Sequence, residues 1–254
     1  MTSTEAYGSP LETVPITVIG GPTVLIEYGG LRLLTDPTFD QPREYPGSFE
    51  KKSAPSVGPD SLGRIDAVLL SHDEHVDNLD ESGRALLADV PVTYTTRSGA
   101  IRLAGSAAGL APWESVTLER ADGGGVTITA TPALHGPPGA ESVVGEVIGF
   151  LLSGDGLPTV YVSGDNASLD VVREVAARAG TIDTADRVAG AVRRPVQGGA
   201  LLTLDAAGAA DAVRILGARR VVPAHVDGWA HFTEGPDDVA RAFAAAGLAH
   251  TLQG

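Results

Sequence analysis

The sequence predicts an α/β protein in which two β-sheets pack face to face and helices cover them on the outside. Three observations lead to this fold class. The chain opens with strand-like runs separated by glycine turns, continues from residue 66 with short apolar runs that alternate with helical stretches, and carries several strands in succession between residues 115 and 162. Because no Ser/Gly-rich linker divides the sequence, we expect a single domain over residues 1–254, with a polar leader at residues 1–14.

The first part of the chain predicts an antiparallel meander followed by a long loop. Residues 16–19, 24–28 and 31–35 are apolar and rich in β-branched side chains, and pairs of glycines lie between them. Residues 37–59 contain five prolines and mixed charge without periodicity, which is typical of a surface loop. We expect this loop to shape the rim of a pocket.

The remainder predicts mixed sheets with outer helices. We expect strands at residues 67–70, 92–95, 115–118, 126–131, 144–152, 159–162, 200–203 and 220–223. Amphipathic spacing predicts helices near residues 80–89, 100–107, 169–179, 206–216 and 236–246. Since most strands between residues 115 and 162 follow each other without a helix, antiparallel or mixed pairing is expected there.

Composition excludes several classes of protein. The 254 residues carry 18 basic and 32 acidic side chains, and the net charge of −14 disfavours nucleic acid and anionic membranes as partners. No cysteine is present, so any metal must be held by nitrogen and oxygen. No signal peptide or apolar run of membrane-spanning length is visible, so we expect a cytoplasmic protein that acts on a small-molecule substrate, as a monomer or a homo-oligomer.

The six histidines give the sharpest functional signal. His72 and His75 follow the strand at 67–70, His135 follows the strand at 126–131, and His225 follows the strand at 220–223. Asp165 follows the strand at 159–162 in the same way. Imidazoles and carboxylates are good ligands for Zn²⁺ or Mn²⁺, and a metal with an open position turns bound water into a nucleophile. We therefore predict a metal site at these strand ends.

The segment 71–78, Ser-His-Asp-Glu-His-Val-Asp-Asn, can be interpreted in two ways. His72, His75 and Asp77 are spaced so that two imidazoles and a carboxylate can point into one small volume. Alternatively, Asp77, Asn78 and Asp80 cap the following helix and the histidines are merely solvated. The other strand-end residues favour the metal site.

Four motifs carry a resemblance to a known family. Ser71-His72-x-x-His75-x-Asp77-Asn78, Thr131-Pro132-Ala133-x-His135-Gly136, Ser163-Gly164-Asp165 and Pro223-Ala224-His225 resemble, in this order, the motifs of the metallo-β-lactamase superfamily. Residues 23–27 and 33–37 look like the branch containing ascorbate-6-phosphate lactonase and N-acylphosphatidylethanolamine phospholipase D. The resemblance spans about residues 16–234. It implies a four-layer αββα sandwich with metals at one edge of the two sheets.

The resemblance also implies the roles of individual residues. His72, His75 and His135 correspond to the imidazoles of a first metal, Asp165 to a bridging carboxylate, and Asp77 with His225 to ligands of a second metal. The sequence departs from the family pattern at two places. The usual His-x-His-x-Asp-His contains one extra residue here, so either His72 or Asp73 is the first ligand. In addition, Asn78 stands where a second-metal histidine is usual, which leaves one or two ions open.

Three other residues have two interpretations each. Asp36 either orients a ligand histidine from behind or forms an ordinary Asp-Pro turn. His231 either lines the pocket beside His225, where it could bind an oxyanion, or packs in an aromatic segment. His250 lies near the C-terminus, where we expect a surface side chain.

The sequence thus predicts a metal-dependent hydrolase for an ester, lactone or phosphoester, with Asp77 and His231 as catalytic residues. Asp77 would hold the nucleophile. The alternatives are a metal-binding protein of the same fold with little turnover, and redox use of iron at the same ligands.

Overall fold

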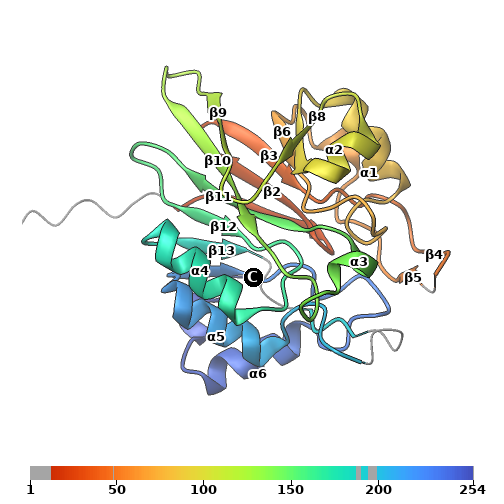
Figure 1. Ribbon diagram of the computed structural model, residues 1–254, viewed down its shortest axis with the longest axis vertical. Coiled ribbons are helices and arrows are strands. Elements are labelled where there is room, and N and C mark those ends of the chain that lie inside the picture. The colour runs from red at the N-terminus through yellow and green to blue at the C-terminus, as the bar shows by residue number, and fades with distance from the viewer. Residues whose placement is uncertain (1–12, 48, 187–189, 194–198, 254) are drawn as a thin grey trace, which may run out of the picture.

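The computed structural model describes residues 13–47, 49–186, 190–193 and 199–253. Most of the predicted leader, residues 1–12, lies outside the described residues. The described chain forms two six-stranded sheets and a separate two-stranded hairpin, with helices on the outer faces (Figure 1).

The first sheet begins with the predicted meander and continues with parallel strands. Its order is β1-β2-β3-β6-β7-β8, with β1 to β3 antiparallel and β3, β6, β7 and β8 parallel. The strands are β1 (Ile16–Gly20), β2 (Thr23–Tyr28), β3 (Leu31–Thr35), β6 (Ala67–Leu69), β7 (Thr93–Thr96) and β8 (Ala107–Leu110). The antiparallel opening predicted from the glycine turns is confirmed.

The second sheet has the mixed pairing that the sequence predicts. Its order is β14-β13-β12-β11-β10-β9, with antiparallel pairs from β9 to β12 and parallel pairs from β12 to β14. The strands are β9 (Ser115–Glu119), β10 (Gly125–Pro132), β11 (Ile148–Ser153), β12 (Val160–Val162), β13 (Thr184–Asp186) and β14 (Arg220–Val222). Consequently β10, β12 and β14 run in the same direction and end at the same edge.

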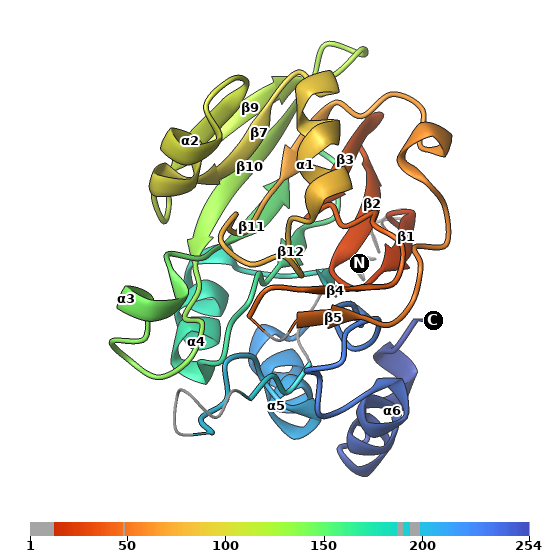
Figure 2. The same cartoon turned by 90° about the vertical axis from the view of Figure 1, so that its right-hand side faces the viewer.

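Helices cover the outer faces of both sheets, and Figures 1 and 2 show the resulting layers. The first sheet is covered by α1 (Glu81–Leu86), which continues into η2 (Leu87–Asp89), and by α2 (Arg97–Leu103). The second sheet is covered by α4 (Leu169–Ala179), α5 (Ala206–Leu216) and α6 (Pro236–Ala245). The short elements α3 (Glu141–Val144), η1 (Pro59–Ser61) and η4 (Ala249–Thr251) lie in connections. This is the four-layer αββα sandwich.

The central core lies between the two sheets. Ile26 and Leu33 of the first sheet pack in one cluster with Ile128 and Phe150 of the second, all fully buried. Burying a side chain of this size stabilises the fold by about 1.5–3 kcal/mol. This apolar layer fixes one sheet against the other and therefore fixes the strand ends at their common edge.

Four details of the sequence-based assignment were wrong. The predicted strand at 200–203 forms only an isolated bridge between Arg193 and Leu201. The predicted helix at 100–107 ends at Leu103, because Ala104 takes a φ of +55°, and β8 follows. The predicted strand at 144–152 begins only at Ile148, after α3 and a turn. The strand β13 was missed because it has three residues and ends in a buried aspartate.

The predicted loop at 37–59 also contains a hairpin, formed by β4 (Arg43–Tyr45) and β5 (Phe49–Lys51). A buried ion pair attaches it to the body: Lys51 Nζ lies 2.9 Å from Asp80 Oδ2, and the two side chains are 5% and 0% exposed. Asp80 also caps α1 by accepting a hydrogen bond from Gly83 N at 2.8 Å. The hairpin therefore has a fixed place beside the first sheet. Within the described residues, no helix combines the length and apolar character that a membrane span requires.

We predict that Lys51→Met destabilises the protein by about 3–5 kcal/mol, because it leaves the Asp80 carboxylate buried without its cation. Lys52→Met is the matched control, since Lys52 pairs with Glu50 at the surface and is 55% exposed. Its effect should stay within about 0.5 kcal/mol. Urea unfolding of both variants measures the difference, and equal midpoints would contradict the structural role given to the buried pair.

Candidate metal centre

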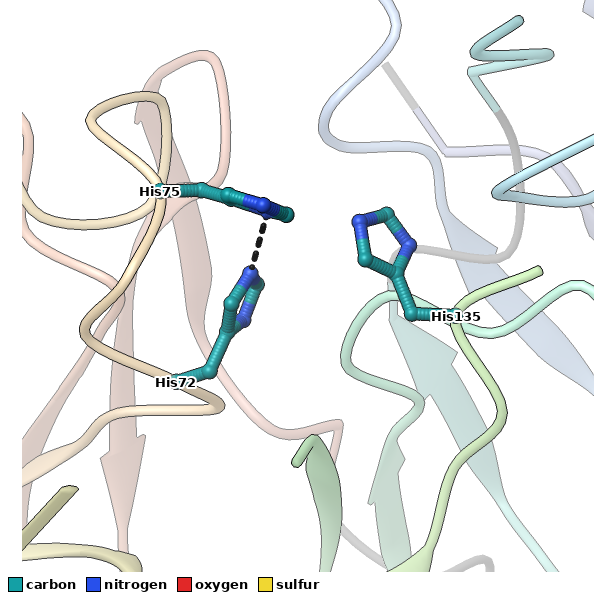
Figure 3. A group of neighbouring side chains, drawn as sticks. All are labelled: His72, His75 and His135. Atoms are coloured by element: carbon teal, nitrogen blue, oxygen red, sulfur yellow. Dashed lines mark hydrogen bonds between the residues drawn. The ribbon is translucent and has the colours of Figure 1, made fainter. Parts of the chain in front are cut away.

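Three imidazoles meet at the edge where the two sheets abut. His72 and His75 lie in the loop after β6, and His135 lies in the loop after β10 (Figure 3). His72 Nε2 lies 3.0 Å from His75 Nδ1, and one ring nitrogen from each of the three histidines lies within 4.8 Å of the other two. His72 and His135 are buried, whereas His75 is half-buried. Ring nitrogens at these separations can share one divalent ion.

Hydrogen bonds from the far side fix which nitrogens face this centre. His135 Nδ1 donates to the carbonyl oxygen of Leu202 at 2.8 Å, which leaves Nε2 for a ligand. His72 Nδ1 lies 3.0 Å from Ser71 Oγ, and Ser71 Oγ donates to Asp36 Oδ2 at 2.6 Å. The imidazole of His72 is therefore oriented by a hydroxyl that is itself held by a buried carboxylate.

Asp36 has a larger role than an Asp-Pro turn requires. Its carboxylate accepts hydrogen bonds from Ser71 N at 2.6 Å, from Ser71 Oγ, and from Asn78 Nδ2 at 3.0 Å. The side chain is fully buried, and its φ of +26° is uncommon for a residue other than glycine. Asp36 thus joins both ends of the segment 71–78. The sequence motif pointed to Ser71 but gave it no role, because its partner lies 35 positions earlier in the chain.

The extra residue in the histidine loop is accommodated by an outward turn at Asp73. Its carboxylate faces Arg102 of α2, with Nε at 3.0 Å and 3.2 Å from its two oxygens. Arg84 donates to the backbone carbonyl of Asp73 at 3.2 Å. The Asp73 side chain is engaged by Arg102, whereas the ring of His72 faces the other two imidazoles.

Beside the three imidazoles lies a second group of acids and histidines. Asp165, after β12, places Oδ2 at 3.8 Å from His135 Nε2 and Oδ1 at 3.0 Å from His225 Nδ1. His225 Nε2 lies 3.4 Å from Asp77 Oδ2, and the same oxygen lies 2.9 Å from His231 Nε2. The structure thus brings together all seven residues singled out for metal binding or catalysis. His250 is exposed on η4, as expected.

Burial and the contacts among these side chains shift the pKa values of several of them. Burial holds the pKa of His72 well below its usual value, and the neighbouring His75 acts in the same direction. Burial disfavours the ionised form of Asp77 and Asp165, but their imidazole neighbours outweigh it and hold both carboxyl pKa values far below the usual range. For His225 burial is outweighed by the carboxylates of Asp165 and Asp77, which raise its pKa to about 9. Both carboxylates are therefore ionised in a buried place, which requires positive charge nearby.

The residues present fit a divalent cation. Five imidazoles and two ionised carboxylates converge, and these are ligands that Zn²⁺ and Mn²⁺ accept. Asp77 Oδ1 is buried without a hydrogen-bond partner among the described residues. His225 adopts a left-handed backbone with φ +60°, and strain of this kind is common at functional sites. A cation would compensate the buried negative charge and use the vacant lone pairs.

The sequence matches the model of the family described as "Beta-lactamase superfamily domain" over residues 31–226, which is more than half of the chain. No curated protein sequence matches this chain. The closer likeness to the lactonase and phospholipase D branch remains a prediction from the opening motifs.

Solved structures share the fold. The isothiocyanate hydrolase from Delia radicum gut bacteria is 19% identical, with a TM-score of 0.79 over 93% of this chain and 94% of its own. The metallo hydrolase Igni18 from Ignicoccus hospitalis is 18% identical, with a TM-score of 0.68 over 94% of both chains. The diiron β-hydroxylase CmlA from Streptomyces venezuelae is 20% identical, with a TM-score of 0.65 over 95% of this chain and 51% of its own.

At these identities the solved structures establish a common fold, and the family model covers the whole second sheet, the strands β3 to β8 of the first sheet and every predicted metal ligand. His72, His75, Asp77, His135, Asp165 and His225 all fall within residues 31–226. The chain belongs to the metallo-β-lactamase superfamily.

Proposed function

We propose that this protein is a metal-dependent hydrolase that uses activated water on the ester, lactone or phosphoester of a small molecule. The observation that carries the proposal is the group of His72, His75 and His135, whose ring nitrogens lie within 4.8 Å of one another. The assignment of His72 rather than Asp73 as ligand is part of the proposal. The contact of Asp73 with Arg102 supports it.

The donor set supports Zn²⁺ or Mn²⁺ as the cofactor. The chain has no cysteine, so the ligands are imidazole, which suits zinc, and carboxylate, which suits manganese. When bound, such an ion polarises the substrate and lowers the pKa of a bound water towards neutrality. His72 and His135 hold it with nitrogens whose opposite ring positions are already hydrogen-bonded, and Asp165 lies beside them.

Asp77 is the residue best placed to manage the proton of the attacking water. Its carboxylate is ionised and buried, and Oδ1 has no partner within the described residues, so this oxygen can accept a hydrogen bond. Oδ2 is held by His231 Nε2 at 2.9 Å. We therefore assign Asp77 and His231 to the catalytic group, with His231 fixing the direction of the carboxylate.

The hairpin β4–β5 supplies the wall of the proposed substrate site. The ring of Phe49 lies 5.1 Å from that of His231 and 6.1 Å from that of His75, measured between centroids. A substrate bound beside these two histidines would contact the ring of Phe49. This supports the expectation that the proline-rich segment forms part of the pocket rim.

We predict that the purified protein contains zinc or manganese and hydrolyses at least one of bis-p-nitrophenyl phosphate, an aryl ester or a simple lactone, with activity lost on chelation. An isothiocyanate belongs in the same panel because a structural neighbour carries that activity. Bound metal without any turnover would favour the metal-binding alternative. Bound iron with a visible absorption band would favour redox chemistry, which the diiron neighbour makes worth testing.

We predict that His135→Ala lowers metal affinity and turnover together by more than about 100-fold, because it removes a direct ligand. His250→Ala is the control, since that histidine is exposed on η4. Metal analysis after dialysis and initial rates measure the two effects. Unchanged metal content in His135→Ala would overturn the assignment of the site.

We predict that Asp36→Asn weakens metal binding by about 10–100-fold while leaving the fold intact, because it disturbs the hydroxyl that orients His72. Asp60→Asn, at an exposed position, is the matched control. Competition with a chelating dye gives both affinities, and circular dichroism verifies folding. Equal affinities would show that Asp36 has only a turn-forming role.

A further inference from the structure

The departure at Asn78 raises the question of which side chain replaces the missing imidazole. Asn78 is fully buried, and its Nδ2 donates to Asp36 Oδ2 at 3.0 Å, with Ser71 Oγ at 3.4 Å. The Nδ2 group of Asn78 therefore supports the histidine loop from behind, while its Oδ1 is buried without a hydrogen-bond partner among the described residues. An imidazole from a different part of the chain lies against Asp77, even closer than that of His225.

That imidazole belongs to His231, in the loop after β14. The loop is fixed to the hairpin by backbone hydrogen bonds from Ala230 N to Glu50 O at 2.9 Å and from Lys52 N to Gly228 O at 2.7 Å. The rings of Phe49 and Phe232 lie 5.1 Å and 4.7 Å from the ring of His231. His231 is therefore held in place by contacts that do not involve Asp77.

One carboxylate oxygen of Asp77 has close contacts with two imidazole nitrogens. His231 Nε2 and His225 Nε2 lie 2.9 Å and 3.4 Å from Asp77 Oδ2. Ligand atoms at about 2.0–2.2 Å from a Zn²⁺ ion are separated from one another by roughly 3–3.5 Å. The contact of His225 with Asp77 falls in this range, and the contact of His231 is slightly shorter.

The hydrogen bond between His231 and Asp77 leaves other buried polar atoms of this group without partners. Asp77 Oδ1 and His225 Nε2 are buried without hydrogen-bond partners among the described residues, and His225 Nε2 approaches Asp77 only at 3.4 Å. Buried polar atoms without partners are costly. A cation between the two imidazoles and the carboxylate would satisfy the acceptor of Asp77 and the lone pair of His225 together.

We propose that His231 is a ligand of a second metal ion, together with Asp77 and His225, and takes the place of the histidine that Asn78 replaces. The inference rests on the proposed function, because it presumes a first ion at His72, His75 and His135. It makes the chain dinuclear despite Asn78. One ligand then comes from the loop that also contacts the hairpin β4–β5.

The test counts metal ions rather than turnover. Protein stripped with a chelator, reloaded with zinc and dialysed should retain about two ions per chain, measured by plasma mass spectrometry. His231→Gln should retain about one, because the glutamine amide can still donate a hydrogen bond to Asp77 but is a poor zinc ligand. His231→Phe, which keeps a ring between Phe49 and Phe232, should also retain about one. His250→Gln is the control and should match the unaltered protein.

Cobalt substitution gives a second readout. Titration of the stripped protein with Co²⁺ should produce two successive absorption changes, and the second should disappear in both His231 variants. Two ions retained in His231→Gln would overturn the inference and reduce His231 to a residue that positions Asp77. One ion in the unaltered protein, with turnover present, would overturn it while leaving the proposed hydrolase intact. No ion at all would instead overturn the proposed function itself.

Discussion

Two ionised carboxylates buried at the junction of the sheets are the constraint on which the site depends. Asp77 and Asp165 are 4% and 2% exposed, and a charge in such a place is costly unless cations and donors surround it. The surrounding imidazoles provide part of this compensation, and their own protonation responds to the same charges. The ring of His225 lies between both carboxylates, and its backbone has the uncommon φ of +60°. A bound cation requires buried oxygen and nitrogen atoms whose lone pairs are free, and Asp77 Oδ1 and His225 Nε2 have no hydrogen-bond partner among the described residues.

The sandwich makes this arrangement possible by bringing strand ends from both sheets to one edge. Since β10, β12 and β14 run in the same direction, His135, Asp165 and His225 emerge side by side from the second sheet. The loop after β6 supplies His72 from the first sheet across the central core. Packing of Leu33 against the same core as Ile128 fixes the position of the first sheet, and so of His72, relative to the ligands from the second sheet. A substitution deep between the sheets could therefore alter ligand geometry without touching any ligand.

Much of this could be predicted from local pattern, and the remainder depends on contacts between distant segments. The strand β3 and the helices α4 and α5 have the predicted bounds, because their periodicity and flanking residues are clear over their whole length. The strands β8 and β13 are short and contain alanine, glycine or aspartate, which have low strand propensity, so only their pairing with neighbours defines them. The hairpin β4–β5 escaped notice because its main attachment, Lys51 to Asp80, joins residues 29 positions apart. The ligand candidates could be found because they directly follow predicted strands. The residues that hydrogen-bond to them from behind, such as Leu202 behind His135, could not be found in this way, because they lie far away in the sequence.

The two departures from the family motif illustrate the same principle at the site. An extra residue between His72 and His75 would separate the rings if the loop were extended, but Asp73 turns outward to Arg102 and the two ring nitrogens still lie 3.0 Å apart. An asparagine at position 78 removes an imidazole from the loop, yet it also provides the donor that joins the loop to Asp36. In both places the residue that departs from the motif has a partner in another element: Asp73 contacts Arg102, and Asn78 donates to Asp36. Ligand geometry is therefore a property of the assembled edge, and a motif can change in length and composition while the arrangement of nitrogen and oxygen atoms persists.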